Sequence, residues 1–189
     1  MRIVAGTAGR TVLVAPKGHN TRPTSDIARE SLFNIISANI VGARFLDLFC
    51  GSGAVGLEAL SRGAAEVVLV DSQKLAIQAA LQNLNKTKLC GAQVMESTAQ
   101  RAIAKLSSAG RIFDFIFLDP PYDTDLLEQT MQQLCNTSLL ANTGMIIAET
   151  DSKLAVPPPP AAFTLVDSRK YGRTSFLLYS INSHGGECI

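Results

Sequence analysis

From residue 44 onward, the hydrophobic positions of the chain follow two alternating patterns. Short apolar runs that end near a glycine or an acid have the length of buried strands, and the segments between them carry apolar residues at helical spacing. We expect strands at 45–49, 66–71, 92–96, 113–119 and 144–149, and helices at 54–63, 73–86, 98–106 and 125–135. Strands separated by helices of this length are typical of βαβ units. The pattern therefore predicts an α/β fold with a mainly parallel sheet and helices on both faces.

The two ends of the chain have a different pattern. Residues 2–6 and 11–15 flank a turn and predict a β-hairpin, and residues 163–181 predict a second antiparallel hairpin that turns near Gly172. Between the first hairpin and the core, Ser25 and Asp26 have the chemistry of a helix start. The apolar face of this helix is expected to consist of Ile27, Leu32, Phe33, Ile35 and Ile36. Four prolines at 157–160 indicate a stiff surface connection.

Length and composition place the chain among ordinary globular proteins. With 189 residues, of which 47% are hydrophobic and 17% charged, it can bury a sizeable core. We expect a single domain over 1–189, with an N-terminal hairpin and helix extension at 1–44, a core at 45–181 and a frayed tail at 182–189. No apolar run approaches the roughly 18 residues of a membrane span, and no secretory signal is visible at the N-terminus.

Cysteine and histidine are scattered along the sequence. The four cysteines, at 50, 90, 135 and 188, form no CxxC pair, and the two histidines are His19 and His184. A structural zinc site needs clustered ligands, so no metal is expected. We interpret all four cysteines as reduced thiols in a cytoplasmic protein.

A glycine-rich segment follows the first predicted strand of the core. Gly51, Gly53 and Gly56 form GxGxxG between a strand and a helix, and Asp71 closes the next strand. Glycines there allow a tight turn and close ligand approach, and an acid at this spacing suits a ribose diol. The segment predicts a nucleoside-containing cofactor, which could be a nicotinamide, a flavin or S-adenosylmethionine.

Asp47 narrows this choice. It ends an otherwise apolar strand, four residues before Gly51. A carboxylate beside a pyrophosphate would be repelled, whereas the amine and sulfonium of S-adenosylmethionine are both positive. Asp47 therefore favours S-adenosylmethionine, against the alternative of a buried aspartate that caps a helix.

The sequence Asp119-Pro120-Pro121-Tyr122 ends the predicted strand at 113–119. An exocyclic amine of a base has its lone pair delocalised into the ring, and two acceptors are needed to hold its N–H bonds. The Asp119 carboxylate and the Pro120 carbonyl provide such a pair on a stiff backbone, and Tyr122 offers a face for an unstacked base. These residue types point to methyl transfer to an amino group.

These motifs together resemble a known family. Residues 2–6, 21–26, 29–35, 45–64, 115–122 and 170–172 look like the bacterial 16S ribosomal RNA (guanine-N2)-methyltransferases, the RsmD family, and matches run from residue 2 to about 181. The resemblance implies one methyltransferase domain with the Rossmann-like class I fold and a seven-stranded sheet. It also implies 16S ribosomal RNA as a partner, within a small ribosomal subunit or its assembly intermediate, and no membrane or metal.

The resemblance also assigns site residues. Cofactor contacts are implied for Asp47, Gly51, Ser52, Gly53, Gly56, Asp71, Ser72, Thr98 and Ala99. Asp119, Pro120, Pro121 and Tyr122 would hold the target guanine, and Arg10, Arg22 and Thr24 match family positions near the RNA. The basic ends of the chain add Arg2 and Arg173 to the expected RNA contacts, against the alternative of solvated surface charges. Thr98 departs from the family, which usually has aspartate at the adenine contact. A hydroxyl can still form a hydrogen bond there.

Several alternatives are weighed against this interpretation. A DNA adenine-N6 methyltransferase shares the Asp-Pro-Pro-Tyr segment, but the chain has no recognisable target-recognition domain. A glutamine methyltransferase that acts on release factors would more often have asparagine at 119, and a nicotinamide oxidoreductase would not explain Asp47. A non-enzymatic alternative is an RNA-binding ribosome-assembly factor with a vestigial cofactor pocket.

The net charge of +1 conceals an uneven distribution. Residues 1–44 carry six Lys or Arg against two Asp or Glu, residues 45–168 carry eight against thirteen, and residues 169–189 carry three against one. An acidic body with basic flanks can still meet RNA locally, so the near-neutral total does not exclude a nucleic-acid substrate.

Overall fold

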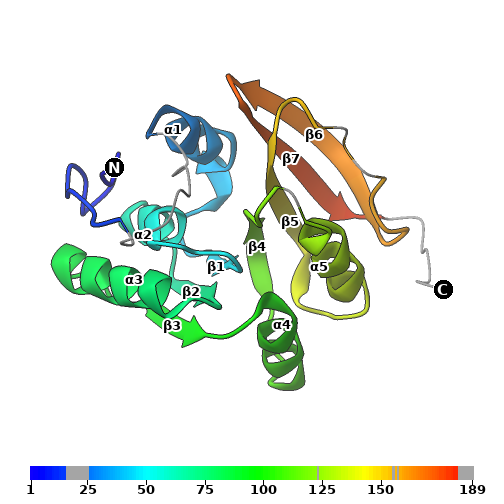
Figure 1. Cartoon of the computed structure of the whole chain (residues 1–189), viewed down its shortest axis with the longest axis horizontal. Coiled ribbons are helices and arrows are strands. Elements are labelled where there is room, and N and C mark those ends of the chain that lie inside the picture. Colours follow the sequence, from blue (N-terminus) through cyan, green and yellow to red (C-terminus); the bar gives the residue numbers. More distant parts are fainter. Residues whose placement is uncertain (16–25, 123, 155, 157, 183–189) are drawn as a thin grey trace. The chain divides into compact units, whose positions relative to one another are not determined.

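The fold is described by a computed structural model over residues 1–15, 26–122, 124–154, 156 and 158–182 (Figure 1). Within these residues, seven strands form one mixed sheet in the order β3-β2-β1-β4-β5-β7-β6. Helices alternate with the first five strands along the chain. The predicted α/β class, with a mainly parallel sheet, is confirmed.

The chain divides into two compact units, Met1–Thr98 and Ala99–Ile189. The first contains α1 (Asp26–Ile35), the short 3-10 helix η1 (Ser37–Asn39), β1 (Arg44–Asp47), α2 (Ala54–Ser61), β2 (Glu66–Asp71), α3 (Lys74–Thr87) and β3 (Ala92–Glu96). The second contains α4 (Ala99–Ser108), β4 (Phe113–Leu118), α5 (Leu126–Cys135), β5 (Leu140–Asp151), β6 (Phe163–Tyr171) and β7 (Thr174–Ile181).

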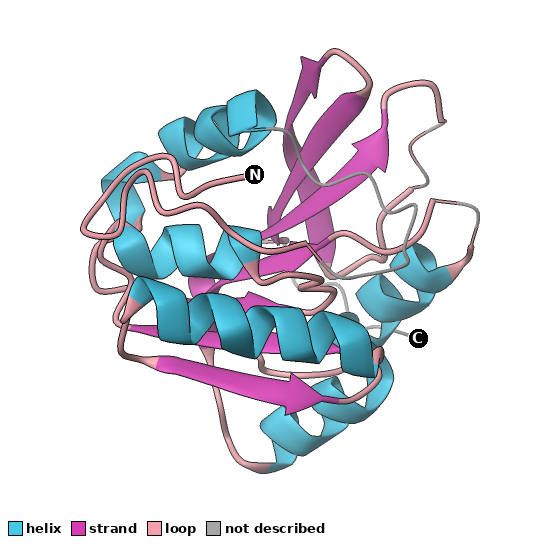
Figure 2. Ribbon diagram, turned by 60° about the vertical axis from the view of Figure 1, so that its left-hand side comes forward, coloured by secondary structure: helices cyan, strands magenta, loops and turns pink. Residues whose placement is uncertain are grey.

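In the first unit, three parallel strands are covered by helices. β1 pairs with β2, and β2 with β3, and α2 and α3 lie side by side over one face of these strands (Figure 2). All four residues 67–70 at the centre of β2 are fully buried. A strand that is apolar at every position is expected when a parallel sheet is covered.

In the second unit, a parallel pair continues into an antiparallel hairpin. β4 pairs in parallel with β5, whereas β7 pairs antiparallel with both β5 and β6. The predicted hairpin at 163–181 is confirmed, and Gly172 at its turn has a φ of +63°, a value that favours glycine. The register of β6 shifts between Leu165 and Asp167, so β6 contains a β-bulge.

The N-terminal arm, residues 1–15, pairs with itself less regularly than predicted. Its antiparallel pairing consists of one isolated bridge, Arg2 to Val12, in place of two strands. One reason lies in its hydrogen bonds, because the N–H group of Ala5, which would extend the pairing beyond the Arg2–Val12 bridge, binds the carboxylate of Glu58 on α2. A helix side chain therefore occupies a donor that a strand ladder would use.

The helical faces also differ from the pattern in the sequence. Ile27, predicted in the core, is 74% exposed, while Arg29 two residues later is fully buried. On α3, Leu75 and Leu81 are exposed, and the polar Asn83 is buried. The interior of the first unit therefore holds polar groups that hydrophobic periodicity alone does not identify.

The expectation that all four cysteines are reduced is wrong. Cys135 at the end of α5 is disulfide-bonded, whereas Cys50 and Cys90 are free thiols, the first buried and the second exposed. His19, His184 and Cys188 lie outside the described residues. Within the described part of the chain, no group of acidic, histidine or cysteine side chains could hold a metal ion. No helix in that part is long and apolar enough to span a membrane.

Candidate active site

The loop between β1 and α2 has the backbone geometry that its glycines predict. Gly51 has a φ of +52°, and a side chain added there would meet nothing within 4 Å. Gly53 precedes the first residue of α2 with a φ of +77°. Both values lie in the left-handed region where glycine is favoured. The glycine loop, residues 48–53, is thus tightly turned and open at Gly51, as close approach by a ligand requires.

Asp71, at the end of β2, lies directly against this loop. Its Oδ2 accepts a hydrogen bond from the Gly51 N–H at 2.9 Å, and its Oδ1 accepts one from the Gln73 N–H at 2.8 Å. The structure therefore brings together the two parts of the fingerprint that are 20 residues apart in sequence. Each carboxylate oxygen has a second lone pair with which to accept a further hydrogen bond.

Gly56, the third glycine of the fingerprint, has a different surrounding. It lies inside α2, and an added Cβ would come within 2.3 Å of Leu69 Cδ2 and 2.8 Å of Val67 Cγ1 on β2. The same Cβ position is 3.6 Å from Oδ2 of Asp47. Gly56 therefore allows α2 to approach β2 closely, which also brings the helix beside the Asp47 carboxylate.

Asp47 contributes a buried carboxyl group at the start of the loop. Its exposed fraction is 1%. Burial raises the pKa of the neighbouring Cys50 thiol well above its usual value, and the charges of Asp47 and Asp71 raise it further. The loop region is therefore acidic, which favours a positively charged ligand group and keeps Cys50 in the unreactive thiol form.

The other predicted cofactor residues occupy separate places. Ser52 lies in the glycine loop and is largely buried, while Ser72 follows Asp71 and is exposed. Thr98 is exposed and directly precedes α4, whose first residue, Ala99, is buried. Thr98 is therefore accessible to solvent as a residue.

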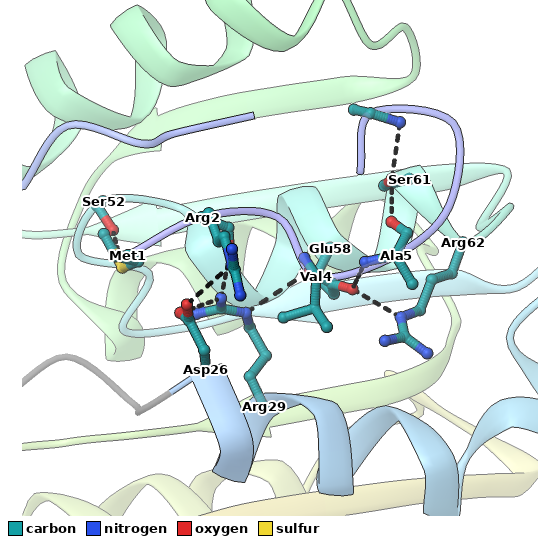
Figure 3. A network of polar contacts seen from close by, with 11 residues as sticks. Met1, Arg2, Val4, Ala5, Asp26, Arg29, Ser52, Glu58, Ser61 and Arg62 are labelled. Carbon is teal, nitrogen blue, oxygen red and sulfur yellow. Dashed lines mark hydrogen bonds and ion pairs between the residues drawn. The ribbon is translucent and has the colours of Figure 1, made fainter. Parts of the chain in front are cut away.

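A buried acid on α2 holds the N-terminal arm in the first unit. Glu58 is fully buried and accepts hydrogen bonds from the N–H groups of Val4 at 2.6 Å and Ala5 at 3.0 Å (Figure 3). It also accepts one from Nε of Arg62 at 2.7 Å. Three donors satisfy a carboxylate that would otherwise be costly to bury.

Arg29 on α1 completes this network from the other side. Its Nε lies 3.6 Å from Oε2 of Glu58, and its Nη2 donates to Oδ1 of Asp26 at 2.9 Å and to the backbone carbonyl of Arg2. The network links α1, α2 and the arm (Figure 3). Sequence reasoning missed it, because a helical arginine on a predominantly apolar stretch gives no sign of its distant partners.

In the second unit, the Asp119–Tyr122 segment forms the turn after β4. Asp119 is half-buried, Pro120 is buried and Pro121 is exposed. The hydroxyl of Thr124 donates to the Pro121 carbonyl at 2.8 Å, which fixes the turn beyond the prolines. A carboxylate and a carbonyl at adjacent positions on a backbone restrained by two prolines are preorganised hydrogen-bond acceptors.

Tyr122 has a partly open ring and a partly buried hydroxyl. The residue is 40% exposed, and its hydroxyl lies 3.4 Å from Oε1 of Glu149 on β5, as a donor. Burial raises the pKa of Tyr122, and the charges of Asp119 and Glu149 add to this effect. The phenol therefore stays neutral, and Glu149 orients its ring. Sequence reasoning missed Glu149, because an acid at the end of a predicted strand gives no sign that it contacts Tyr122.

The predicted RNA-contact residues are only partly described. Arg2 is exposed and pairs with Asp26 at 3.5 Å, Arg10 is exposed with a φ of +69°, and Arg173 at the β6–β7 turn pairs with Asp151 at 3.3 Å. Arg22 and Thr24 lie outside the described residues. The three described arginines remain available at the surface, because exposed ion pairs exchange readily with other anions.

Comparison with known proteins identifies the family of this chain. A family model described as conserved hypothetical protein 95 matches residues 1–180. Ribosomal RNA small subunit methyltransferase D of Escherichia coli is 35% identical over 185 residues, which cover 98% of this chain and 92% of that protein. The chain belongs to the ribosomal RNA small subunit methyltransferase D family.

Further relatives agree with this membership of the methyltransferase D family. YlbH of Bacillus subtilis is 37% identical over 95% of this chain and 98% of its own length. The solved structure of yhhF from Escherichia coli has a TM-score of 0.84 and 34% identity, covering 97% of this chain and 99% of that one. The chain is thus a methyltransferase, and the predicted Rossmann-like architecture is confirmed.

Proposed function

We propose that this methyltransferase transfers a methyl group from S-adenosylmethionine to the exocyclic N2 amine of a guanine in small-subunit (16S) ribosomal RNA. The observation that carries the proposal is the Asp119–Tyr122 turn, with two adjacent acceptors on a restrained backbone and a half-exposed aromatic ring. The name of the Escherichia coli relative, a ribosomal RNA small subunit methyltransferase, supports the choice of RNA.

The glycine loop fits S-adenosylmethionine better than a dinucleotide. The space beside Gly51 admits a ligand, and the buried charge of Asp47 would attract the cofactor's amine and sulfonium. Asp71 would accept hydrogen bonds from the ribose hydroxyls while it retains its bond to Gly51. Ser52, Gly53, Gly56, Ser72, Thr98 and Ala99 complete the proposed set. When bound, the cofactor supplies an already activated methyl group.

The chain's own contribution to the reaction is then mainly positioning. The Asp119 carboxylate and the Pro120 carbonyl would accept the two N–H bonds of the target amine and direct its lone pair. Pro121 restricts the same turn, and Tyr122 would stack on the unstacked guanine. Holding the two reactants in line is worth several kcal/mol of the barrier. A small displacement of the target amine would therefore slow methyl transfer.

The basic ends of the chain would supply RNA contact. Arg2, Arg10 and Arg173 are exposed, and Arg22 and Thr24 are proposed from the family resemblance. Folded RNA presents its bases chiefly in loops, so we propose that the substrate is the assembled small subunit or an assembly intermediate. Because residues 45–168 carry more acidic than basic side chains, we expect RNA contact at these basic positions instead.

Replacement of Asp119 by alanine tests the proposal. The variant should lose nearly all methyl transfer to small subunits isolated from a strain that lacks the modification, while it binds S-adenosylhomocysteine like the wild type. Asp125→Ala is the matched control, because Asp125 is an exposed acid near the same turn and makes no side-chain bond to cap α5. Nuclease digestion and mass spectrometry would identify the product as N2-methylguanine. Near-normal turnover by Asp119→Ala would contradict the assignment.

Calorimetric titration of the wild type with S-adenosylhomocysteine distinguishes the non-enzymatic alternative. Measurable binding supports the proposed cofactor. No binding would favour an RNA-binding assembly factor with a vestigial pocket.

A further inference from the structure

Asn83 on α3 is a fully buried polar side chain that joins two distant parts of the first unit. Its Oδ1 accepts a hydrogen bond from the Val14 N–H at 2.7 Å, and its Nδ2 donates to the Val14 carbonyl at 2.9 Å. The same Nδ2 donates to the Ser52 carbonyl at 2.9 Å. One amide therefore binds both the N-terminal arm and the glycine loop.

The three bonds require the chemistry of an amide. Both N–H groups of Asn83 are used against carbonyls, and its oxygen is used against an N–H. An aspartate of the same size would keep the bond from Val14 N–H but turn an oxygen toward two carbonyl oxygens. Because the site is buried, water cannot replace the lost donors, and each unpaired group carries a large cost.

The contacted carbonyl lies at the centre of the glycine loop. Ser52 lies between Gly51 and Gly53, the two residues of the glycine loop that have a positive φ. Its hydroxyl also contacts the sulfur of Met1 at 3.6 Å, and the Leu13 N–H donates to the Met1 carbonyl at 3.1 Å. Both ends of the arm therefore reach the residue on which the loop turns.

We infer that Asn83 is a positioning residue that couples the N-terminal arm to the cofactor loop, so that cofactor affinity depends on how the arm is held. This inference rests on the proposed function. Coupling between two segments is reciprocal in free energy. A ligand that orders the loop therefore also orders the arm, which carries the proposed RNA contacts Arg2 and Arg10.

Asn83→Asp tests the loop side of the coupling, with Asn85→Asp as the matched control. Asn85 is exposed and lies two residues further along the same helix, so the control carries the same change of charge. Titration with S-adenosylhomocysteine should show a Kd at least about ten-fold weaker for Asn83→Asp, as loss of buried donors predicts. The control should stay within about two-fold of the wild type.

Val14→Pro tests the arm side, and it serves equally if Asn83→Asp does not fold. Proline removes the N–H that Asn83 accepts. A weakened affinity for S-adenosylhomocysteine in this variant would show that the way the arm is held at Val14 is transmitted to the cofactor loop. If the loss is smaller when Val14→Pro is introduced into Asn83→Asp than in the wild type, the transmission runs through Asn83. A merely structural role for Asn83 predicts a lower midpoint of thermal unfolding with the same affinity.

Hydrogen exchange gives a second readout of the coupling. Saturating S-adenosylhomocysteine should slow exchange of the amides at 11–14 in the wild type and leave them unaffected in Asn83→Asp. If the wild type binds the ligand but the two variants bind it equally well, the inference is overturned while the proposed function stands. If the wild type does not bind it at all, the proposed function and the inference fail together.

Discussion

Glu58→Gln removes one charge from the ion network that holds the arm against α1 and α2. The substitution keeps the shape of the side chain but removes the fully buried partner of the Arg29 guanidinium at 3.6 Å, so that the half-buried Asp26 at 2.9 Å is the ion pair that remains. Breaking a buried pair in this way costs about 3–5 kcal/mol. Because a domain is stable by about 5–15 kcal/mol in total, the variant should lose about a fifth or more of its stability.

Urea and thermal denaturation would measure this loss. For a chain of this size, each kcal/mol moves the melting temperature by about 2–4 °C, so a decrease of roughly 6–20 °C is expected. Glu30→Gln, at an exposed position on α1, is the control and should change stability by less than about 0.5 kcal/mol. A cost below about 1 kcal/mol for Glu58→Gln would show that the network is not desolvated as described.

A double-mutant cycle separates the charge of Arg29 from its packing. Arg29→Met introduced into Glu58→Gln should cost less than Arg29→Met in the wild type, since the arginine then no longer balances a buried carboxylate. Additive effects would contradict the coupling between the two side chains.

Three further predictions concern the glycine loop and the helix behind it. Burial and the nearby charges of Asp47 and Asp71 raise the pKa of Cys50, so iodoacetamide at neutral pH should modify the exposed Cys90 before Cys50. Peptide mass spectrometry would measure the two rates of modification, and equal rates would contradict the prediction. The folded chain also keeps the Cys50 proton at a pH where the unfolded thiol loses it, so the free energy of unfolding should fall as pH rises through the ordinary thiol range, and less so in Cys50→Ser. Gly56→Ala should lower the free energy of unfolding by about 1–3 kcal/mol in urea titrations, because its Cβ would lie 2.3 Å from Leu69 Cδ2. A stabilisation of about 1 kcal/mol, which is usual for this change inside a helix, would instead show that the side chains of β2 move aside at little cost.

The sequence predicts the regular core of the fold well. The strands at 66–71 and 92–96 have the predicted bounds. The first is a β-branched and apolar run, and the second is placed by the alternation of strands and helices, since its own residues are partly polar. The convergence of Gly51 and Asp71 also follows from sequence, since parallel strands bring their carboxyl ends to one edge.

The sequence does not predict which polar groups are buried. Arg29, Glu58 and Asn83 are all fully buried, and their partners lie up to 69 residues away in sequence. Periodicity treats such residues as solvent-facing and assigns the core to apolar residues such as Ile27, which is exposed. The same contacts explain the irregular arm, whose N–H groups bind helix side chains in place of a second strand.

The β-bulge in β6 has a consequence for how this molecule behaves beside others. β6 is the last strand in the sheet order, so one of its edges carries no neighbouring strand from the residues that the structure describes. Leu165 pairs with Tyr179 and Asp167 with Leu178, which leaves Val166 without a register partner on β7. The two exposed apolar residues of the strand, Leu165 and Val166, therefore lie where it bends. A bent edge followed by Arg169 and Lys170 is a poor template for a strand from another molecule, and this protects the sheet from growing by strand addition.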